Sequence, residues 1–136
     1  MELKDWKERT ALMWAAQEGR VAMVRELLAR GAAVDAAVND GTTPLLIAST
    51  KGHLEVVREL LAQGAAVDAA TYCGVTPLHV VCVNGHTEIV RALLARGASP
   101  SRENSRGCSP LSFATHGGHG AIVDLIRAAL DRVHRI

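Results

Sequence analysis

This sequence has few aromatic residues and almost no excess of charge of either sign. Only 3% of its 136 residues are aromatic although 49% are hydrophobic, so we expect a core of leucine, valine, isoleucine and alanine. The formal net charge is +1, which removes the electrostatic argument for binding nucleic acid or an anionic membrane surface. The composition therefore predicts that neither nucleic acid nor membrane is a partner.

Long hydrophobic runs are also missing. No apolar stretch approaches the roughly 20 residues that a transmembrane helix needs, and the opening residues, Met1 to Asp5, contain no apolar core of a signal peptide. The three cysteines are an odd number, which favours reduced thiols over a disulfide framework. These absences predict a soluble cytoplasmic or nuclear protein that is not secreted.

What the sequence does contain is a pattern that recurs every 33 residues. The clearest copy is 74–99, GVTPLHVVCVNGHTEIVRALLARGAS, and looser copies lie at 41–66, from Gly107 onward and at the beginning of the chain. A hydroxyl residue occupies one equivalent position in each copy, at Thr10, Thr43, Thr76 and Ser109. A period of this length predicts a solenoid, in which short units stack and share one core.

Two helices are predicted within each copy. Thr76-Pro77 gives a hydroxyl N-cap followed by proline at the first helical position, and Gly85 ends this helix. A second helix is expected from about Thr87 until Gly97, which ends it in the left-handed conformation. The apolar positions form columns that should face the shared core: Leu12, Leu45, Leu78 and Leu111; Val24, Val57, Val90 and Val123; Leu27, Leu60, Leu93 and Ile126; Ala15, Ala48, Val81 and Ala114.

The motifs TPLHVV, GHTEIV and LLARGA, and their second copies TPLLIA, GHLEVV and LLAQGA, closely resemble the ankyrin repeat family. The resemblance covers nearly the whole chain, as four repeats at about 5–37, 38–70, 71–103 and 104–136 within a single domain, 1–136. It implies an all-α solenoid of stacked helix-turn-helix units with projecting loops. It also implies that the loop tips and first helices form a concave surface for partners.

Both end repeats depart from the pattern. Residues 5–9 stand where the first loop would be, with glutamate at the usual glycine position, so we interpret them as an N-terminal cap before a helix that begins after Thr10. We expect Trp6 and Trp14 to close the core at this end. The last helix, from Ala121 to about residue 135, lacks a closing glycine and carries Arg127 where the other repeats have leucine. These features predict a C-terminal cap.

Positions that vary between repeats while the framework stays fixed are the candidates for partner binding. They are Asn39, Asp40, Thr42, Thr50, Tyr72, Cys73, Val75, Val83, Arg106 and His116, together with Lys7 and Arg9 in the region of the first loop. Tyr72, Val75 and Val83 would form an apolar centre with charges at its rim, as in many protein interfaces. We interpret the chain as a non-enzymatic protein-binding module or scaffold, with the partner unidentified and self-association through the same patch as an alternative.

A second hypothesis uses the histidines and cysteines. Their spacing matches no zinc motif, so we expect no metal and no cofactor. Equivalent residues of adjacent repeats lie side by side, which would bring His79 next to Ser112, and two cysteines precede helix N-termini, where a thiolate is favoured. The alternative function is therefore an engineered, esterase-like hydrolase site with a Cys or Ser nucleophile and a His base, drawn from Cys73, His79, Cys108, Ser112 and His116. Against it, the resemblance implies that His79 makes local hydrogen bonds.

Arginines recur on the second helices, at Arg25, Arg58 and Arg91. Glu55 and Glu88 precede two of them by three residues, a spacing that gives ion pairs on one helical face. We interpret this convex stripe as a solvated, mildly stabilising surface.

Overall fold

Helices account for all of the regular structure in the part of the chain that the computed structural model describes, which is the backbone of residues 3–134 and the side chains of residues 11–133. They are α1 (Leu3–Glu18), α2 (Val21–Ala29), α3 (Pro44–Lys51), α4 (Leu54–Ala62), α5 (Pro77–Asn84), α6 (Thr87–Ala95), α7 (Pro110–His116) and α8 (Gly120–His134). The predicted all-α repeat solenoid is therefore confirmed.

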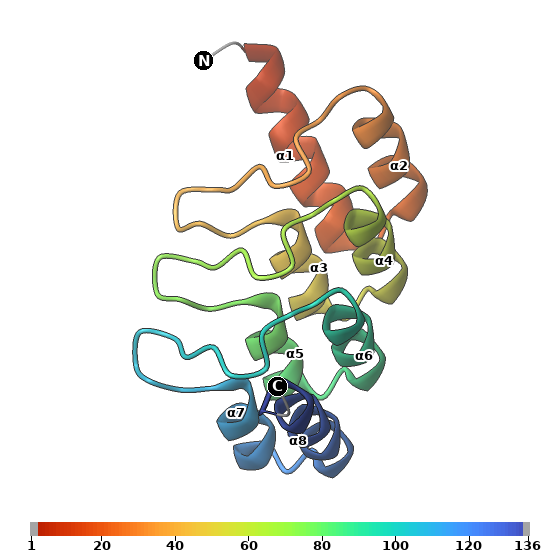
Figure 1. Cartoon of the computed structure of the whole chain (residues 1–136). Helices are drawn as coiled ribbons and strands as arrows, with labels where there is room; N and C mark the ends of the chain where they lie inside the picture. Colours follow the sequence, from red (N-terminus) through yellow and green to blue (C-terminus); the bar gives the residue numbers. More distant parts are fainter. Residues whose placement is uncertain (1–2, 135–136) are drawn as a thin grey trace.

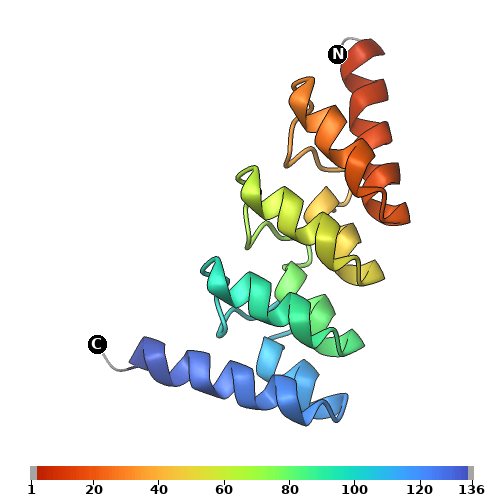
Figure 2. The same ribbon diagram turned by 90° about the vertical axis from the view of Figure 1, so that its right-hand side faces the viewer.

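The helices form two layers. The inner helices α1, α3, α5 and α7 contact one another in sequence order, and the outer helices α2, α4, α6 and α8 do the same beside them (Figure 1). Each inner helix also packs against the outer helix that follows it. Figure 2 shows the resulting pairs stacked in a gently curved array. We number these pairs as repeats one to four.

The inner helices of repeats two to four begin where the sequence predicts. Thr43, Thr76 and Ser109 are the N-caps, and each side chain accepts a hydrogen bond from the backbone N–H three residues later, at 3.2 to 3.3 Å. Proline occupies the first turn of all three helices. A hydroxyl cap followed by proline thus fixes each helix start. The hydroxyl accepts a hydrogen bond from an N–H group that has no partner within the helix, and proline has no N–H group to satisfy.

The prediction that the first inner helix begins after Thr10 is wrong, because α1 runs without interruption from Leu3 to Glu18. Ala11 stands where the other repeats have proline, and residues 3–10 contain no glycine to form a loop. Leucine, lysine, glutamate and arginine in this stretch all favour helix, so the helix continues upstream. Lys7 and Arg9, predicted to lie at a loop tip, therefore lie within a helix.

Trp14 does not give the closure that we expected from the sequence. The Trp14 side chain is 45% exposed, and the guanidinium carbon of Arg20 lies 5.5 Å from its ring centroid. An arginine over an indole ring is a cation–π contact at the surface, so Trp14 is not a core residue. The Trp6 side chain lies outside the described residues, and its predicted role stays a prediction.

The predicted apolar columns form the core. Leu12, Leu45 and Leu78 are fully buried, and the same holds for Val24, Val57 and Val90 and for Ala15, Ala48, Val81 and Ala114. Leu27 in repeat one and Leu111 and Val123 in repeat four are only partly buried. The end repeats have a neighbouring repeat on one side only, so part of each of these three side chains stays exposed while other core residues of the same repeats are buried.

The last repeat carries two of the features from which a C-terminal cap is predicted. Helix α8 begins one residue before the predicted Ala121 and reaches His134, so it is longer than the outer helices α4 and α6. Arg127, which replaces a leucine of the other repeats, is exposed. A charge at this position suits the solvent-facing side of the array.

Three tight loops project from the inner layer, as Figure 1 shows, and we call them finger 2 (38–42), finger 3 (71–75) and finger 4 (104–108). Each is closed by a hydrogen bond from the N–H of its first residue to the carbonyl of its last, at 2.9 to 3.0 Å. Adjacent fingers are also joined: Tyr72 N–H donates to Asp40 O at 3.1 Å, and Ser105 N–H donates to Cys73 O at 2.8 Å. Repeat one has no finger, since α1 occupies that part of the chain.

Within residues 3–134, no helix is both long and apolar enough to cross a membrane.

Candidate functional site

The fingers and inner helices carry the residues that the sequence singles out for partner binding. Tyr72 at the tip of finger 3 is 82% exposed, and Val83 near the end of α5 is 46% exposed. The other predicted positions are at least partly exposed: Asn39, Asp40, Cys73, Arg106 and His116 are exposed, and Thr42, Thr50 and Val75 are half-buried. Large apolar side chains left in water are the feature of this face that needs an explanation.

An apolar cleft of about 190 Å³ lies among them, lined by Thr50, Val75, His79, Val80, Val83, Asn84 and Phe113. It is centred on repeat three and also takes side chains from α3 and α7. Three of its residues, Thr50, Val75 and Val83, are predicted partner-binding residues. The structure therefore brings together positions that are up to 33 residues apart in the sequence.

Sequence reasoning did not select Val80, Asn84 and Phe113 as binding residues. Val80 and Phe113 occupy the same position of the repeat as Ile47 and the exposed Trp14. This column lies one residue before the fully buried alanine and valine column, so it falls at the edge of the core. The place of this column directly before the buried column is the signal that could have identified Val80 and Phe113.

His79 forms one wall of the cleft and makes hydrogen bonds through both ring nitrogens. Its Nδ1 accepts from the Thr76 backbone N–H at 3.0 Å and lies 2.8 Å from the Thr76 hydroxyl oxygen. Its Nε2 lies 2.9 Å from the carbonyl oxygen of Arg102, to which it donates in the tautomer that these partners select. The Phe113 ring meets it edge-on, with centroids 5.6 Å apart.

Burial is the main cause that lowers the pKa of His79 below its ordinary value of 6.5, because removal from water disfavours the charged ring. The side chain is 1% exposed. The neutral ring matches the hydrogen bonds above, since only a neutral imidazole can accept at Nδ1. The cleft wall is thus uncharged at neutral pH, and His79 has no ring nitrogen left for a ligand.

Two residues of the hydrolase alternative, Ser112 and His79, make hydrogen bonds at their own helix starts. The Ser112 hydroxyl donates to Ser109 O at 2.8 Å and accepts from Ser109 N–H at 3.0 Å, within its own capping box. His79 is hydrogen-bonded elsewhere, as described above. Cys108 precedes the start of α7 and His116 is the last residue of that helix. The length of α7, about 10 Å, therefore separates the two residues.

The three cysteines are free thiols in different surroundings. Cys73 is exposed at a fingertip, Cys108 is half-buried, and Cys82 is fully buried. Burial raises the pKa of the Cys82 thiol to about 12, which keeps it protonated and unreactive. Among the residues that the structure describes, no group of three or more His, Cys, Asp and Glu side chains could hold a metal ion.

Asp40 places a carboxylate at the tip of finger 2. Its Oδ1 accepts a hydrogen bond from the Thr42 backbone N–H at 2.9 Å. Hydrogen bonds from Thr42 lower the pKa of the Asp40 carboxyl, because they stabilise its charged form. Asp40 is therefore ionised at neutral pH and forms one charged edge of the face.

Comparison with known families assigns the fold. A family model described as ankyrin repeats in three copies matches residues 1–71. The chain belongs to the ankyrin repeat family. A second model, of ankyrin repeats in many copies, matches residues 60–114. Ankyrin repeats generally act as protein-binding scaffolds, and solenoids of this kind present an extended concave surface to their partners. No curated protein matches the chain.

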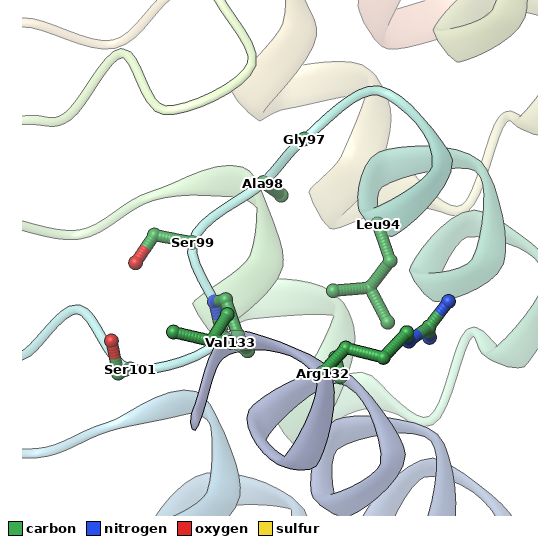
Figure 3. A pocket seen from close by; sticks show the side chains of 9 residues that line it. Leu94, Gly97, Ala98, Ser99, Ser101, Arg132 and Val133 are labelled. Carbon is green, nitrogen blue, oxygen red and sulfur yellow. The ribbon is translucent and has the colours of Figure 1, made fainter. Parts of the chain in front are cut away.

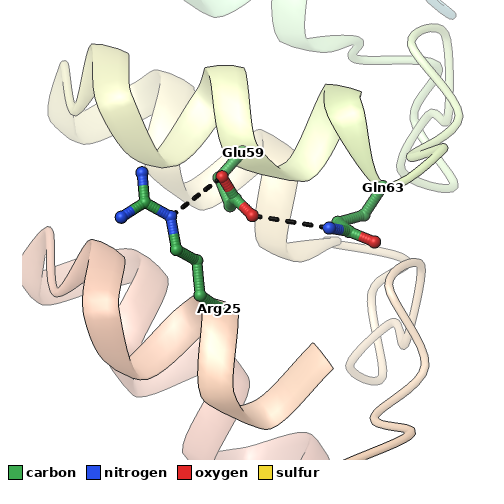
Figure 4. Close-up of polar contacts among 3 residues, drawn as sticks. All are labelled: Arg25, Glu59 and Gln63. Carbon is green, nitrogen blue, oxygen red and sulfur yellow. Dashed lines mark hydrogen bonds and ion pairs between the residues drawn. The ribbon is translucent and has the colours of Figure 1, made fainter. Parts of the chain in front are cut away.

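The convex face of this ankyrin repeat protein carries the predicted arginine stripe. Arg58 pairs with Glu55 at 2.8 Å and Arg91 with Glu88 at 3.4 Å, which confirms the predicted spacing. Arg25 instead reaches across to repeat two, where its Nε lies 3.1 Å from Glu59 (Figure 4). Exposed pairs of this kind contribute little individually, and their charges are already matched within the chain.

A larger groove of about 430 Å³ lies between the end of α6 and the end of α8 (Figure 3). Leu94, Ala98 and Val133 are among the residues that line it. The ankyrin chain turns at Gly97 after α6, whereas α8 has no glycine at this point and continues as a helix. The groove follows from that difference between two outer helices, and it contains none of the predicted site residues.

Proposed function

We propose that this ankyrin repeat protein is a binding module for another protein, and that fingers 2 to 4 together with the inner helices form its binding face. The single observation that carries the proposal is the apolar cleft, one wall of which is the exposed side chain of Val83. Protein interfaces combine a desolvated apolar centre with a polar rim, and aromatic side chains supply much of their energy. The cleft gives such a centre, and exposed Asp40 and Arg106 place charges on fingers 2 and 4.

The rigidity of the face also supports binding. Each finger is closed by its own backbone hydrogen bond and is tied to the next finger, so the tips are held before a partner arrives. A surface that is already ordered loses less conformational entropy on association. The hydrolase alternative has no comparable support, because both ring nitrogens of His79 and the hydroxyl of Ser112 are hydrogen-bonded to other groups.

The proposal is tested with Val83→Asp, which places a charge in the exposed mouth of the cleft. Ala128→Asp is the matched control, because Ala128 is an exposed residue of an outer helix. We expect the parent and the control to retain at least one protein in affinity capture that the Val83 variant loses by tenfold or more, about 1.4 kcal/mol. Circular dichroism checks that both variants fold.

Two outcomes would contradict the proposal. One is that Val83→Asp captures the same proteins as the parent. The other is that light scattering finds a dimer that Val83→Asp dissociates, which would make the face a self-association surface.

A further inference from the structure

The volume of the cleft limits what can enter it. It measures about 190 Å³, whereas pockets that take a free small-molecule ligand measure roughly 300 to 1,000 Å³. An engineered apolar cavity of about 150 Å³ in another protein binds benzene. The cleft therefore has room for one aromatic ring, and a single side chain of a partner protein is the occupant that fits this size.

The walls of the cleft already contain an aromatic pair. The Phe113 ring meets the His79 ring edge-on, with centroids 5.6 Å apart, and three valines complete the apolar lining, Val75, Val80 and Val83. Aromatic rings attract one another in such arrangements beyond what their buried area provides, at centroid separations of roughly 4.5 to 7 Å. An aromatic occupant can extend this pair, which an aliphatic side chain cannot do.

One end of the cleft is polar and is made by Thr50 and Asn84, near the last residues of α3 and α5. The Asn84 Nδ2 donates to the Thr50 backbone oxygen at 3.1 Å, and the Thr50 hydroxyl donates to Leu46 O at 2.8 Å. Asn84 Oδ1 and Thr50 Oγ1 therefore remain as acceptors, and one N–H of Asn84 remains as a donor. His79 adds no polar group, because both of its ring nitrogens are hydrogen-bonded.

Partial charges at this end distinguish between occupants. The last carbonyl groups of a helix have no partner within it and carry the negative end of the helix dipole, so the ends of α3 and α5 favour a hydrogen-bond donor. A phenylalanine side chain would cover the acceptors without bonding to them. A lysine or arginine side chain would be repelled by Lys51, the exposed last residue of α3. A phenol hydroxyl is neutral and can both donate and accept here.

We infer that the partner inserts a tyrosine side chain into the cleft, with its ring beside Phe113 and its hydroxyl at Asn84 and Thr50. This assignment rests on the proposed protein-binding function. A site built to bond a hydroxyl discriminates against an analogue that lacks it, because the polar groups of the site would then be left unpaired. Asn84 thus becomes a residue that determines specificity. The other repeats have no amide at this position, where they carry Glu18, Lys51 and Gly117.

The experiment selects random linear peptides displayed on yeast against the parent protein, with Val83→Asp for counter-selection. We expect the enriched peptides to share a tyrosine. Replacing this tyrosine with alanine should weaken binding to the parent by at least about tenfold, as for the anchor residue of an interface. Replacing it with phenylalanine should weaken binding by about fivefold, because one hydrogen bond is lost.

A double-mutant cycle then identifies the group that the hydroxyl contacts. Asn84→Ala should weaken binding of the tyrosine peptide, so that the tyrosine and phenylalanine peptides bind this variant within about twofold of each other. Gln63→Ala is the matched control, because it removes an exposed amide at the end of the outer helix α4. It should keep the fivefold preference of the parent. Thermal unfolding of each variant establishes that the fold is intact.

The assignment is overturned if no peptide is enriched, if the peptides share no tyrosine, if phenylalanine replaces it without loss, or if Asn84→Ala keeps the preference of the parent. A dimer of the parent that Tyr72→Ala dissociates would also overturn it, since Tyr72 is the one tyrosine of the chain and a second copy would then be the occupant.

Failure of the assignment is distinct from failure of the proposed function. In the first case Val83→Asp still loses captured partners although the tyrosine hydroxyl has no effect on peptide binding. In the second case the Val83 variant keeps those partners.

Discussion

Repeats three and four contain nearly the same framework residues, but they differ in what lies beyond them. Leu78 and Val90 of repeat three are fully buried, whereas Leu111 and Val123 of repeat four are partly exposed. The reason is that α5 and α6 have helices on both sides, while α7 and α8 have them on one side. In a solenoid each repeat gains stability from its nearest neighbours only. The same residue type therefore contributes differently at the two places.

The largest expected effect tests that difference directly. Leu78→Ala should lower the free energy of unfolding by about 3 kcal/mol, because it leaves a cavity with packed walls on every side. Leu111→Ala should lower it by only about 1 to 2 kcal/mol, since part of this side chain is already in water. Urea titrations of both variants give the two values. Equal losses would show that these two equivalent leucines contribute the same stability wherever their repeat lies in the array.

A smaller effect is expected at the glycines that end the inner helices. Gly85 and Gly118 both have positive φ, 80° and 73°, so alanine should cost each about 1 kcal/mol in backbone strain. At Gly85 a new Cβ would also lie 2.7 Å from His119 Cε1 and displace a ring whose Nε2 donates to Val83 O at 3.0 Å. At Gly118 nothing lies within 4 Å.

We therefore expect Gly85→Ala to destabilise the protein by about 1 kcal/mol more than Gly118→Ala, the worth of one hydrogen bond between repeats. The two midpoints of thermal unfolding, compared at equal protein concentration, measure the difference. A larger loss of stability for Gly118→Ala would contradict this expectation. It would mean that backbone strain in the last repeat costs more than displacing the His119 ring between repeats.

The smallest expected effect concerns the residue that follows the helix start by three positions, His79 in repeat three and Ser112 in repeat four. Burial lowers the pKa of folded His79, so between this pKa and about 6.5 the unfolded chain binds more protons than the folded chain. Stability from His79 is complete above about pH 6.5 and is lost as the pH falls below it. Serine has no such titration.

His79→Ser gives repeat three the capping residue of repeat four. We expect the variant to lose less stability than the parent between about pH 7.5 and pH 5.5, although it is less stable at the upper limit. Urea titrations at several pH values give the two slopes, and the other histidines cancel in their difference. Parallel slopes would mean that His79 titrates equally in the folded and unfolded states.

The sequence was sufficient for the architecture because each repeat carries its own start and stop signals. Thr76-Pro77 and Gly85 define α5 without reference to the rest of the chain. The first repeat was mispredicted because its signals are incomplete: Thr10 has no proline after it, and the helix extends upstream to Leu3. A hydroxyl residue alone does not fix a helix start when helix-forming residues precede it.

The candidate site could be predicted only in part. Exposure at Tyr72 and Val83 follows from their place at a tip and on an inner helix, and the structure agrees. Repeat equivalence suggested that His79 and Ser112 would meet, but both side chains hydrogen-bond to their own helix starts. That local choice depends on side-chain orientation, which the 33-residue period does not encode.

The bonds between fingers have a consequence for lengthening the protein. Asp40 O receives the N–H of Tyr72, and Cys73 O receives the N–H of Ser105, so every finger offers its successor an identical backbone acceptor. Duplicating residues 71–103 would preserve each of these links and move Asp40 and Arg106 apart by one stacking step, roughly 8 to 10 Å. Modular insertion would then lengthen the row of fingers in whole units of one repeat.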